Sequence, residues 1–518
     1  MSTRGHVLRN AMFLSMGAYT EFVLGFLTSI IIARHLGPHF FGAYSGVIWL
    51  MAMGVAISNA GTASAAIKFI AEQRAGGHDD QIAPLLDYLR RAQRKFMIAV
   101  LAVCILVILV AGNQVSASLD TWIVLGFLLA TIPLRAGYMF NVGVAKGFQN
   151  FRANALVVLV AAPVNLLMVM IVSWLGMSVY WQLGVFFVSS MLFYLLSRYR
   201  IAPLLPARVP GVEMSQKLVR RVRHHMFYSA LTVGVSFWVA SDTEVLFLNL
   251  YGNAEGAGQF KVAYQLAFGA ANLVPGIFGA LLLPLMASAL THGRKFAGRR
   301  FVASTTYLAL LAVPLIAVGI VFSSNLVGVF YGREYLEAGP ALAVCLAGTA
   351  MTAMTQGAAS LLVSADRQRS MLAVVIGCGV LKLLLDSTLI YLGGLQGAVT
   401  AFTTVCVVQA AALMVLAIRN SAMSPDWYRL LRIVLAAALA AVMVWPLQQQ
   451  LAPLAALIVG SMLLVSVYLI GTLLFGCWSQ ADIAYLQQLH ARIGGSRSVP
   501  GGRLLAWAHH RAYKEAAL

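Results

Sequence analysis

Long apolar stretches separated by short polar breaks recur from residue 10 to residue 477. A helix that crosses the hydrocarbon core of a membrane needs about 20 mostly apolar residues. By that criterion the pattern predicts about fourteen membrane-spanning helices, whose boundaries can shift by several residues. The expected spans are 10–33, 42–67, 95–113, 120–145, 153–174, 178–198, 226–250, 260–288, 302–323, 340–363, 371–391, 395–418, 430–448 and 453–477.

The first two spans are separated by a short break in the stretch SIIIARHLGPHFFGAYSG, residues 29–46. Charged and polar residues end the apolar run, and Gly37 and Pro38 favour a tight turn. The aromatic residues that follow are typical of a membrane interface. The pattern therefore predicts a hairpin at 34–41 that lies outside the cell membrane.

Lysine and arginine residues gather in alternate connections between the predicted spans, which is the pattern of cytoplasmic loops. This alternation predicts an even number of spans with both termini in the cytoplasm. We expect the protein in the inner (plasma) membrane. Arg34, Arg333 and Lys261 are the exceptions on the outer side. The basic residues expected in the cytoplasm include Arg4, Arg9, Arg74, Arg90, Arg91, Arg94, Lys95, Lys146, Arg152, Arg294, Lys295, Arg299, Arg300, Arg367, Arg369, Arg419, Arg429 and Arg432.

Composition supports a membrane protein and excludes other classes. Charged residues are 10% of the chain, whereas soluble domains carry about 25%. The net charge of +19 comes from the cytoplasmic connections, so we expect no nucleic-acid partner. The five cysteines show no metal-site spacing, and we expect no metal site and no disulfide framework. The chain also lacks the G-x-x-x-x-G-K-S/T sequence of an ATP-binding loop, so an ion gradient, the membrane potential or consumption of the cargo would supply the energy.

Two stretches of the sequence repeat one pattern. An apolar run, a glycine, a few turn residues, a second glycine and an aromatic residue occur at 29–50 and again at 245–266. A second pair, KGFQNFRAN and ADRQRSMLA, has a similar offset of roughly 215 residues. The repeat predicts two six-helix halves in the same orientation, related by an axis along the membrane normal. The matched positions are Gly37 with Gly252, Gly42 with Gly258, and Tyr44 with Phe260.

Three motifs, in this order along the chain, resemble the Wzx-like polysaccharide flippases. They are LGPHFFGAYS, SDTEVLFLNLYGNAEGAGQFKVAYQLA and FYGREYLEAGPALAV. These flippases belong to the multidrug/oligosaccharidyl-lipid/polysaccharide (MOP) exporter superfamily. The resemblance extends over about residues 10–420.

The resemblance implies a V-shaped bundle of two lobes around a central cavity. It also implies transfer of an undecaprenyl-diphosphate-linked oligosaccharide from the cytoplasmic to the periplasmic leaflet, for exopolysaccharide, O-antigen or lipopolysaccharide synthesis. On this basis we expect membrane lipid, a glycan polymerase and export machinery as further partners. A monomer is expected, because the internal duplication already supplies both lobes.

The expected organisation follows from the repeat and the basic stretches. The N-lobe would span 1–198 (helices 1–6), a basic cytoplasmic linker 199–224, and the C-lobe 225–420 (helices 7–12). Two extra helices would occupy 421–477, and 478–518 would form a basic cytoplasmic tail.

Cations within spans are candidates for binding a diphosphate, because insertion of a charge costs about 2.5–3.5 kcal/mol. Arg135 lies midway along its span and is the first candidate. The alternative is that Arg135 is a structural partner for Glu21 or another acid. Lys261 is either a cargo contact or a residue that reaches the outer interface. Lys382 is either a cavity residue or a partner of Asp386, four residues later on the same helix face. Trp238 is a candidate for stacking on a sugar.

Carboxylates within spans are candidates for coupling transport to protons or sodium ions, since burial favours proton uptake. These candidates are Glu21, Asp242, Glu244 and Asp386. For each one the alternative is a partner for a buried base or exposure to water at a helix end. No other cofactor is expected.

The leading interpretation is therefore a transporter and not an enzyme. One alternative is an ion-coupled multidrug or toxin extruder of the same superfamily, which would favour an acid-rich aromatic cavity over deep cations. A membrane-embedded glycan polymerase or ligase is a second alternative, although the predicted outer connections are short for a catalytic domain. A scaffold for a glycan-assembly complex is a third.

Overall fold

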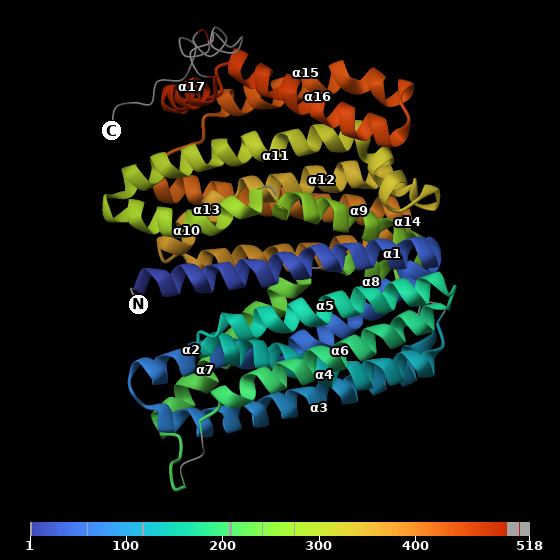
Figure 1. Ribbon diagram of the computed structural model, residues 1–518, viewed down its shortest axis with the longest axis vertical. Helices are drawn as coiled ribbons and strands as arrows, with labels where there is room; N and C mark the ends of the chain where they lie inside the picture. Colours follow the sequence, from blue (N-terminus) through green and yellow to red (C-terminus); the bar gives the residue numbers. More distant parts are fainter. Residues whose placement is uncertain are drawn as a thin grey trace. The chain divides into compact units, whose positions relative to one another are not determined.

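The computed structural model describes residues 3–59, 61–115, 119–206, 210–240, 242–273, 275–494 and 507 (Figure 1). Within these ranges the chain forms α-helices and three short 3-10 helices, without a β-strand. The first helices are α1 (Thr3–Asn59), α2 (Thr62–Ala75), α3 (Ile82–Val115), α4 (Thr121–Gly147), α5 (Phe151–Trp174), α6 (Val179–Ile201), α7 (Gln216–Ala240), α8 (Thr243–Leu250) and α9 (Ala254–Leu273). The others are α10 (Pro275–Thr291), α11 (Arg294–Phe330), α12 (Ala338–Met354), α13 (Gln356–Ser364), α14 (Gln368–Ser421), α15 (Trp427–Gln450), α16 (Pro453–Leu474) and α17 (Gln480–Gly494). The 3-10 helices are η1 (Asp79–Gln81), η2 (Ala202–Leu204) and η3 (Arg333–Tyr335).

By length and composition, ten of the described helices can cross a membrane, or eleven if the bent pair α7 and α8 counts as one span. Two of the ten, α1 and α14, each consist of two helices joined at a glycine with non-helical backbone angles. These glycines are Gly37 (φ 69°, ψ 171°) and Gly394 (φ 52°, ψ −124°). The prediction of an all-α, multi-pass membrane protein is confirmed, and the turn predicted at 34–41 contains Gly37.

Breaks that hydropathy did not indicate interrupt two predicted spans. The span expected at 226–250 is divided between α7 and α8, which are bent by 64°. The span expected at 340–363 has a one-residue irregularity at Thr355 (φ −90°, ψ 2°), between α12 and α13, although Ala338–Ser364 still counts as one of the ten spans. The first break coincides with Asp242, Thr243 and Glu244 and the second with Thr355 and Gln356. Such short polar stretches inside long apolar runs are not resolved by a window average of hydropathy.

The chain divides into two compact units. Unit 1 comprises Met1–Lys261 and Gly379–Ala398, and unit 2 comprises Val262–Cys378 and Val399–Leu518. The lobe boundaries predicted from the sequence stay a prediction.

Each unit has an apolar core of its own. In unit 1, buried residues of α2, α3, α4 and α7 pack together around Phe69, Leu85 and Val222. In unit 2, α11 packs against α15 and α16 through Phe322, Ile433 and Leu464. The Tyr468 hydroxyl of α16 donates a hydrogen bond to the Leu310 carbonyl oxygen at 3.0 Å, which satisfies a polar group inside this core.

The outer faces of several helices carry exposed large apolar residues, as a lipid-facing surface requires. On α3 these residues are Val103, Leu106, Leu109 and Val110. Water-soluble proteins rarely expose contiguous apolar faces of this kind, so the exposure agrees with a membrane environment.

The glycines matched between the two sequence repeats have matching roles in unit 1. Gly37 and Gly252 both have positive φ, at 69° and 76°. Gly42 and Gly258 lie where the two turns pack closely: a Cβ on Gly42 would be 1.8 Å from the Ala254 carbonyl oxygen, and one on Gly258 would be 2.0 Å from the Pro38 carbonyl oxygen. Only glycine permits this approach of two backbones.

Replacing Gly258 by leucine is expected to lower the free energy of unfolding by about 3 kcal/mol or more, because the new side chain meets rigid backbone. Thermal unfolding of the purified protein in detergent measures this loss. Gly126→Leu is the matched control, since a Cβ on Gly126 meets no atom within 4 Å. Equal melting temperatures for the two variants would contradict the close contact.

Candidate functional site

A break between α7 and α8 brings charged residues into the interior of unit 1. Asp242 occupies the position before α8 with non-helical angles (φ −76°, ψ 58°). The Thr243 hydroxyl donates a hydrogen bond to the Trp238 carbonyl oxygen at 2.9 Å. This bond satisfies a carbonyl group that the interrupted helix leaves without its usual partner.

Asp242 is paired with Lys261, which lies on α9. Lys261 Nζ is 2.5 Å from Asp242 Oδ2, and the exposed fractions of the two side chains are 26% and 12%. Lys261 therefore has a carboxylate partner on the helix that follows the outer turn. The sequence suggested two roles for Lys261, a contact with the cargo or a position at the outer membrane interface. This pairing does not decide between them.

A second ion pair joins α8 to α14 and is fully buried. Lys382 Nζ lies 3.0 Å from Glu244 Oε1, with exposed fractions of 1% and 0%. Lys382 also donates to the Val239 carbonyl oxygen at 3.5 Å. The sequence suggested Asp386 as the partner of Lys382, but the structure pairs Lys382 with Glu244, which is far away along the chain.

Asp386 adds a third carboxylate to this group. Its side chain is fully buried, and both carboxylate oxygens have no hydrogen-bond partner among the described residues. Each lysine of the group already has a carboxylate partner, so a charged Asp386 leaves one negative charge in excess. An uncompensated buried charge is costly, and uptake of a cation or a proton would remove it. We call the residues Asp242, Glu244, Lys261, Lys382 and Asp386 the charged cluster.

An aromatic group lies next to the charged cluster. The ring of Trp238 is 6.0 Å from that of Trp49 and 6.4 Å from that of Phe247 (centroid distances). Tyr251 continues the group: its ring is 5.5 Å from that of Tyr391, and its hydroxyl donates to the Ser387 carbonyl oxygen at 3.0 Å. Trp238 is partly buried within these contacts, and its role in stacking on a sugar stays a prediction.

Arg135 lies apart from the charged cluster, on α4, and is held by α6. Its Nε donates to the Ser190 hydroxyl at 3.1 Å. Its guanidinium carbon is 4.9 Å from the ring centroids of both Phe186 and Phe193. Such contacts orient a guanidinium group without neutralising its charge.

Sequence reasoning missed the partners of Arg135, although a signal was present. Phe186, Ser190 and Phe193 are spaced four and three residues apart, so they share one face of α6. Glu21, the partner that the sequence suggested, is exposed on α1 and forms no ion pair with Arg135.

One exposed ion pair ties the predicted basic linker region to α2. Arg221 donates two hydrogen bonds to Glu72, at 2.6 and 3.0 Å. The hydrogen bonds from Arg221 hold the pKa of the Glu72 carboxyl below its ordinary value. In the part of the chain that the structure describes, no three His, Cys, Asp or Glu side chains are placed to hold one metal ion.

Comparisons with known proteins give the family and the fold. The model of a family described as polysaccharide biosynthesis protein matches residues 7–290. No curated protein matches the chain. The lipid II flippase MurJ in an inward closed conformation has a similar structure, with a TM-score of 0.70 at 13% identity over 90% of this chain and 98% of that one.

Drug transporters have similar structures too. A multidrug resistance MATE family transporter of the MOP superfamily, in an inward-facing conformation, gives a TM-score of 0.60 at 14% identity, over 80% of this chain and 98% of that one. The eukaryotic MATE transporter AtDTX14 gives 0.50 at 14% identity, over 80% and 98%. At these identities the likeness shows the fold alone. Because the family model covers more than half of the residues, the chain belongs to the polysaccharide biosynthesis protein family.

Proposed function

We propose that this protein flips an undecaprenyl-diphosphate-linked oligosaccharide from the cytoplasmic to the periplasmic leaflet of the inner membrane, for exopolysaccharide or O-antigen synthesis. The observation that carries the proposal is the match of the polysaccharide biosynthesis family model to residues 7–290. The likeness in fold to a lipid II flippase supports a lipid-linked cargo. Alternating access through a polar cationic cavity is the mechanism that we expect.

Arg135 is the residue that we propose to contact the diphosphate. Among the described residues no carboxylate forms an ion pair with it, while aromatic rings and Ser190 fix its position. A guanidinium group of this kind keeps its charge and several donors for phosphate oxygens. Lys261 and Lys382 each have a carboxylate partner, so they would reach the cargo only if those pairs opened.

The charged cluster is the place where we propose ion coupling. Three carboxylates and two lysines share this buried region. The oxygens of Glu244 and Asp386 have no hydrogen-bond partner among the described residues, but only Glu244 of these two forms an ion pair with a lysine, so Asp386 is the carboxylate without a cation. We favour a proton over a sodium ion, because Lys382 already supplies a fixed cation beside Glu244. Glu21 is exposed on α1 and has less support as a coupling residue.

The experiment that tests the function compares two cargos in proteoliposomes. Purified protein is expected to move a fluorescent undecaprenyl-diphosphate oligosaccharide to the opposite leaflet, measured by its protection from a membrane-impermeant quencher. The same vesicles should show no efflux of ethidium driven by a pH gradient. Ethidium efflux without movement of the glycolipid would instead support the multidrug extruder, which the MATE-like fold keeps as the second candidate.

An enzymatic role has less support than transport. Solved structures of similar fold include a flippase and MATE transporters. If vesicles with the protein lengthened the glycan of the labelled lipid in place of moving it, a polymerase or ligase would be the better assignment. The expected partners, a glycan polymerase and export machinery, and the expected monomer stay predictions.

A further inference from the structure

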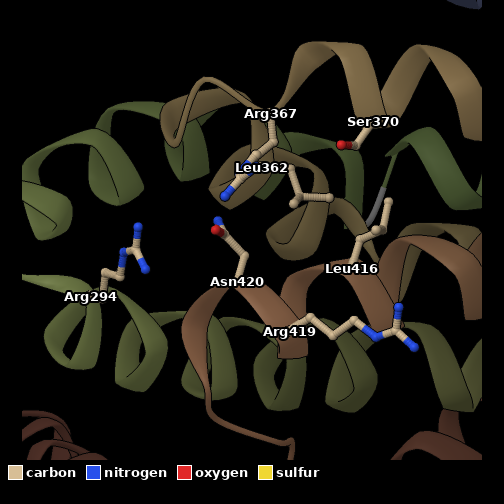
Figure 2. A pocket seen from close by; sticks show the side chains of 7 residues that line it. All are labelled: Arg294, Leu362, Arg367, Ser370, Leu416, Arg419 and Asn420. Carbon is tan, nitrogen blue, oxygen red and sulfur yellow. The ribbon is translucent and has the colours of Figure 1, made fainter.

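A pocket lined by arginine residues lies in unit 2, apart from the residues discussed above (Figure 2). Its volume is about 220 Å³, which is below the range of about 300–1,000 Å³ for drug-sized ligands. Figure 2 shows Arg294, Arg367 and Asn420 directed toward one another, with Arg419 directed away. The lining residues are Arg294, Leu362, Arg367, Ser370, Leu416, Arg419 and Asn420, which we call the arginine pocket.

The arginine pocket is lined by positive charge. Among the described residues that line it, none is a carboxylate. None of its arginine side chains forms an ion pair or a hydrogen bond with a described residue. Guanidinium groups that share a pocket repel one another, and a bound anion would remove this repulsion.

The start of α14 adds a second feature that favours an anion. In the first half of the chain, the turn between α4 and α5 has Gln149 at positive φ (57°), and the Asn150 side chain accepts a hydrogen bond from the Ala153 amide at 3.1 Å. The turn between α13 and α14 has Asp366 at positive φ (56°) and Arg367 at the position of Asn150.

The two turns share the same backbone hydrogen bonds. Asn150 N donates to the Ala145 carbonyl oxygen at 2.9 Å, and Arg367 N donates to the Leu362 carbonyl oxygen at 2.9 Å. An arginine side chain has no acceptor, however, and α14 has no side-chain cap. Ser370 is the counterpart of Ala153 and lines the arginine pocket. The backbone amides at the start of α14, which have no side-chain cap, therefore lie beside the pocket. Such amides bind phosphate groups.

Apolar residues on one side of the arginine pocket indicate what the anion is attached to. Leu362 and Leu416 line it, and Leu416 precedes Arg419 by about one turn of α14. The predicted orientation places Arg294, Arg367 and Arg419 at the cytoplasmic surface. A phosphate on a lipid there can reach the arginines while its acyl chains remain beside the partly exposed Leu416.

We propose that the arginine pocket binds the phosphate of a lipid headgroup in the cytoplasmic leaflet. The shared chemistry is a phosphate anion, which either an anionic phospholipid or a polyprenyl diphosphate carries. The proposal does not depend on which glycan the protein moves, or on whether it moves one.

The test is native mass spectrometry of the full-length protein in detergent, titrated with phosphatidylglycerol, phosphatidylcholine, undecaprenyl diphosphate or inorganic pyrophosphate. The Arg294→Gln/Arg367→Gln double variant is expected to bind phosphatidylglycerol or undecaprenyl diphosphate about tenfold more weakly than the wild type. Arg299→Gln/Arg369→Gln is the matched control: it removes two exposed arginines from the same two helices outside the pocket, and its affinity should stay within about twofold of wild type.

Each outcome decides the proposal. Preference for phosphatidylglycerol assigns the pocket to a membrane phospholipid, and preference for undecaprenyl diphosphate assigns it to a carrier lipid. The proposal would be overturned if the two double variants lost lipid affinity equally, or if the wild type bound phosphatidylcholine as tightly as phosphatidylglycerol. It would also be overturned if inorganic pyrophosphate bound as tightly as either lipid. Ser370→Asp, which adds a carboxylate to the pocket, should weaken binding with an unchanged elution profile. Because no transport is measured, failure of the flippase assignment would leave this result intact.

Discussion

Replacing Lys382 by methionine is expected to lower the free energy of unfolding by about 3–5 kcal/mol, because Glu244 would remain buried without its cation. The side chains of Lys382 and Glu244 are 1% and 0% exposed, so water cannot compensate. Thermal unfolding of the detergent-purified protein measures the loss. Lys261→Met is the comparison variant, and it should cost less, because Lys261 is 26% exposed and its partner Asp242 12%.

A double variant separates charge from packing at this ion pair. Lys382→Met combined with Glu244→Gln removes both charges and should recover most of the lost stability. If the double variant were as unstable as Lys382→Met alone, packing of the lysine stem would be the cause, and the assignment of a strong buried ion pair would be wrong.

The same cluster allows stability and ion coupling to be measured separately. Asp386→Asn removes the carboxylate whose oxygens have no partner among the described residues, so folding should be unchanged or improved. If Asp386 carries the coupling proton, glycolipid transport by this variant should no longer accelerate when a pH gradient is imposed. A full response to the gradient would exclude Asp386 from coupling.

Replacing Arg135 by alanine is expected to reduce glycolipid flipping by about tenfold or more. This reduction corresponds to the loss of one charge-assisted phosphate contact, which contributes about 1.5–3 kcal/mol. The assay is the quencher-protection measurement with the labelled undecaprenyl-diphosphate oligosaccharide. Arg135→Lys keeps the charge and should recover part of the rate, although lysine lacks the planar group that lies near Phe186 and Phe193.

A control distinguishes a cargo contact from a structural role of Arg135. Ser190→Ala removes the hydroxyl that accepts from Arg135 but leaves the guanidinium charge in place. It should reduce flipping less than Arg135→Ala does, because the guanidinium keeps its charge and its other donors for phosphate oxygens. If Arg135→Ala unfolded the protein while flipping per folded molecule stayed at the wild-type rate, the cargo contact would be refuted.

Local sequence signals were sufficient for much of the fold. The turn at Gly37, the junction at Gly394 and the paired glycines of the two repeats could all be placed from apolar runs and turn residues. These features depend on neighbours within a few residues, which a sequence displays directly.

The interior contacts needed information that the sequence does not display. Lys382 and Asp386 are four residues apart, and helix geometry made them the obvious pair. The actual partner, Glu244, is brought to Lys382 by the break before α8. That break has no proline or glycine, and its short polar stretch, Asp242 to Glu244, lies inside a long apolar run that was read as one span. Arg135 was found because a deep arginine is rare, whereas its aromatic partners on α6 resemble ordinary apolar residues.

The matching turns before α5 and α14 bear on how this chain arose. Their amide-to-carbonyl contacts coincide although few side chains do, as expected if one ancestral segment was copied and then diverged. Exchange of asparagine for arginine at the capping position would then have converted a structural element of one copy into a ligand site in the other. In distant relatives, this capping position offers a marker for alignment of the two copies where residue identity has vanished.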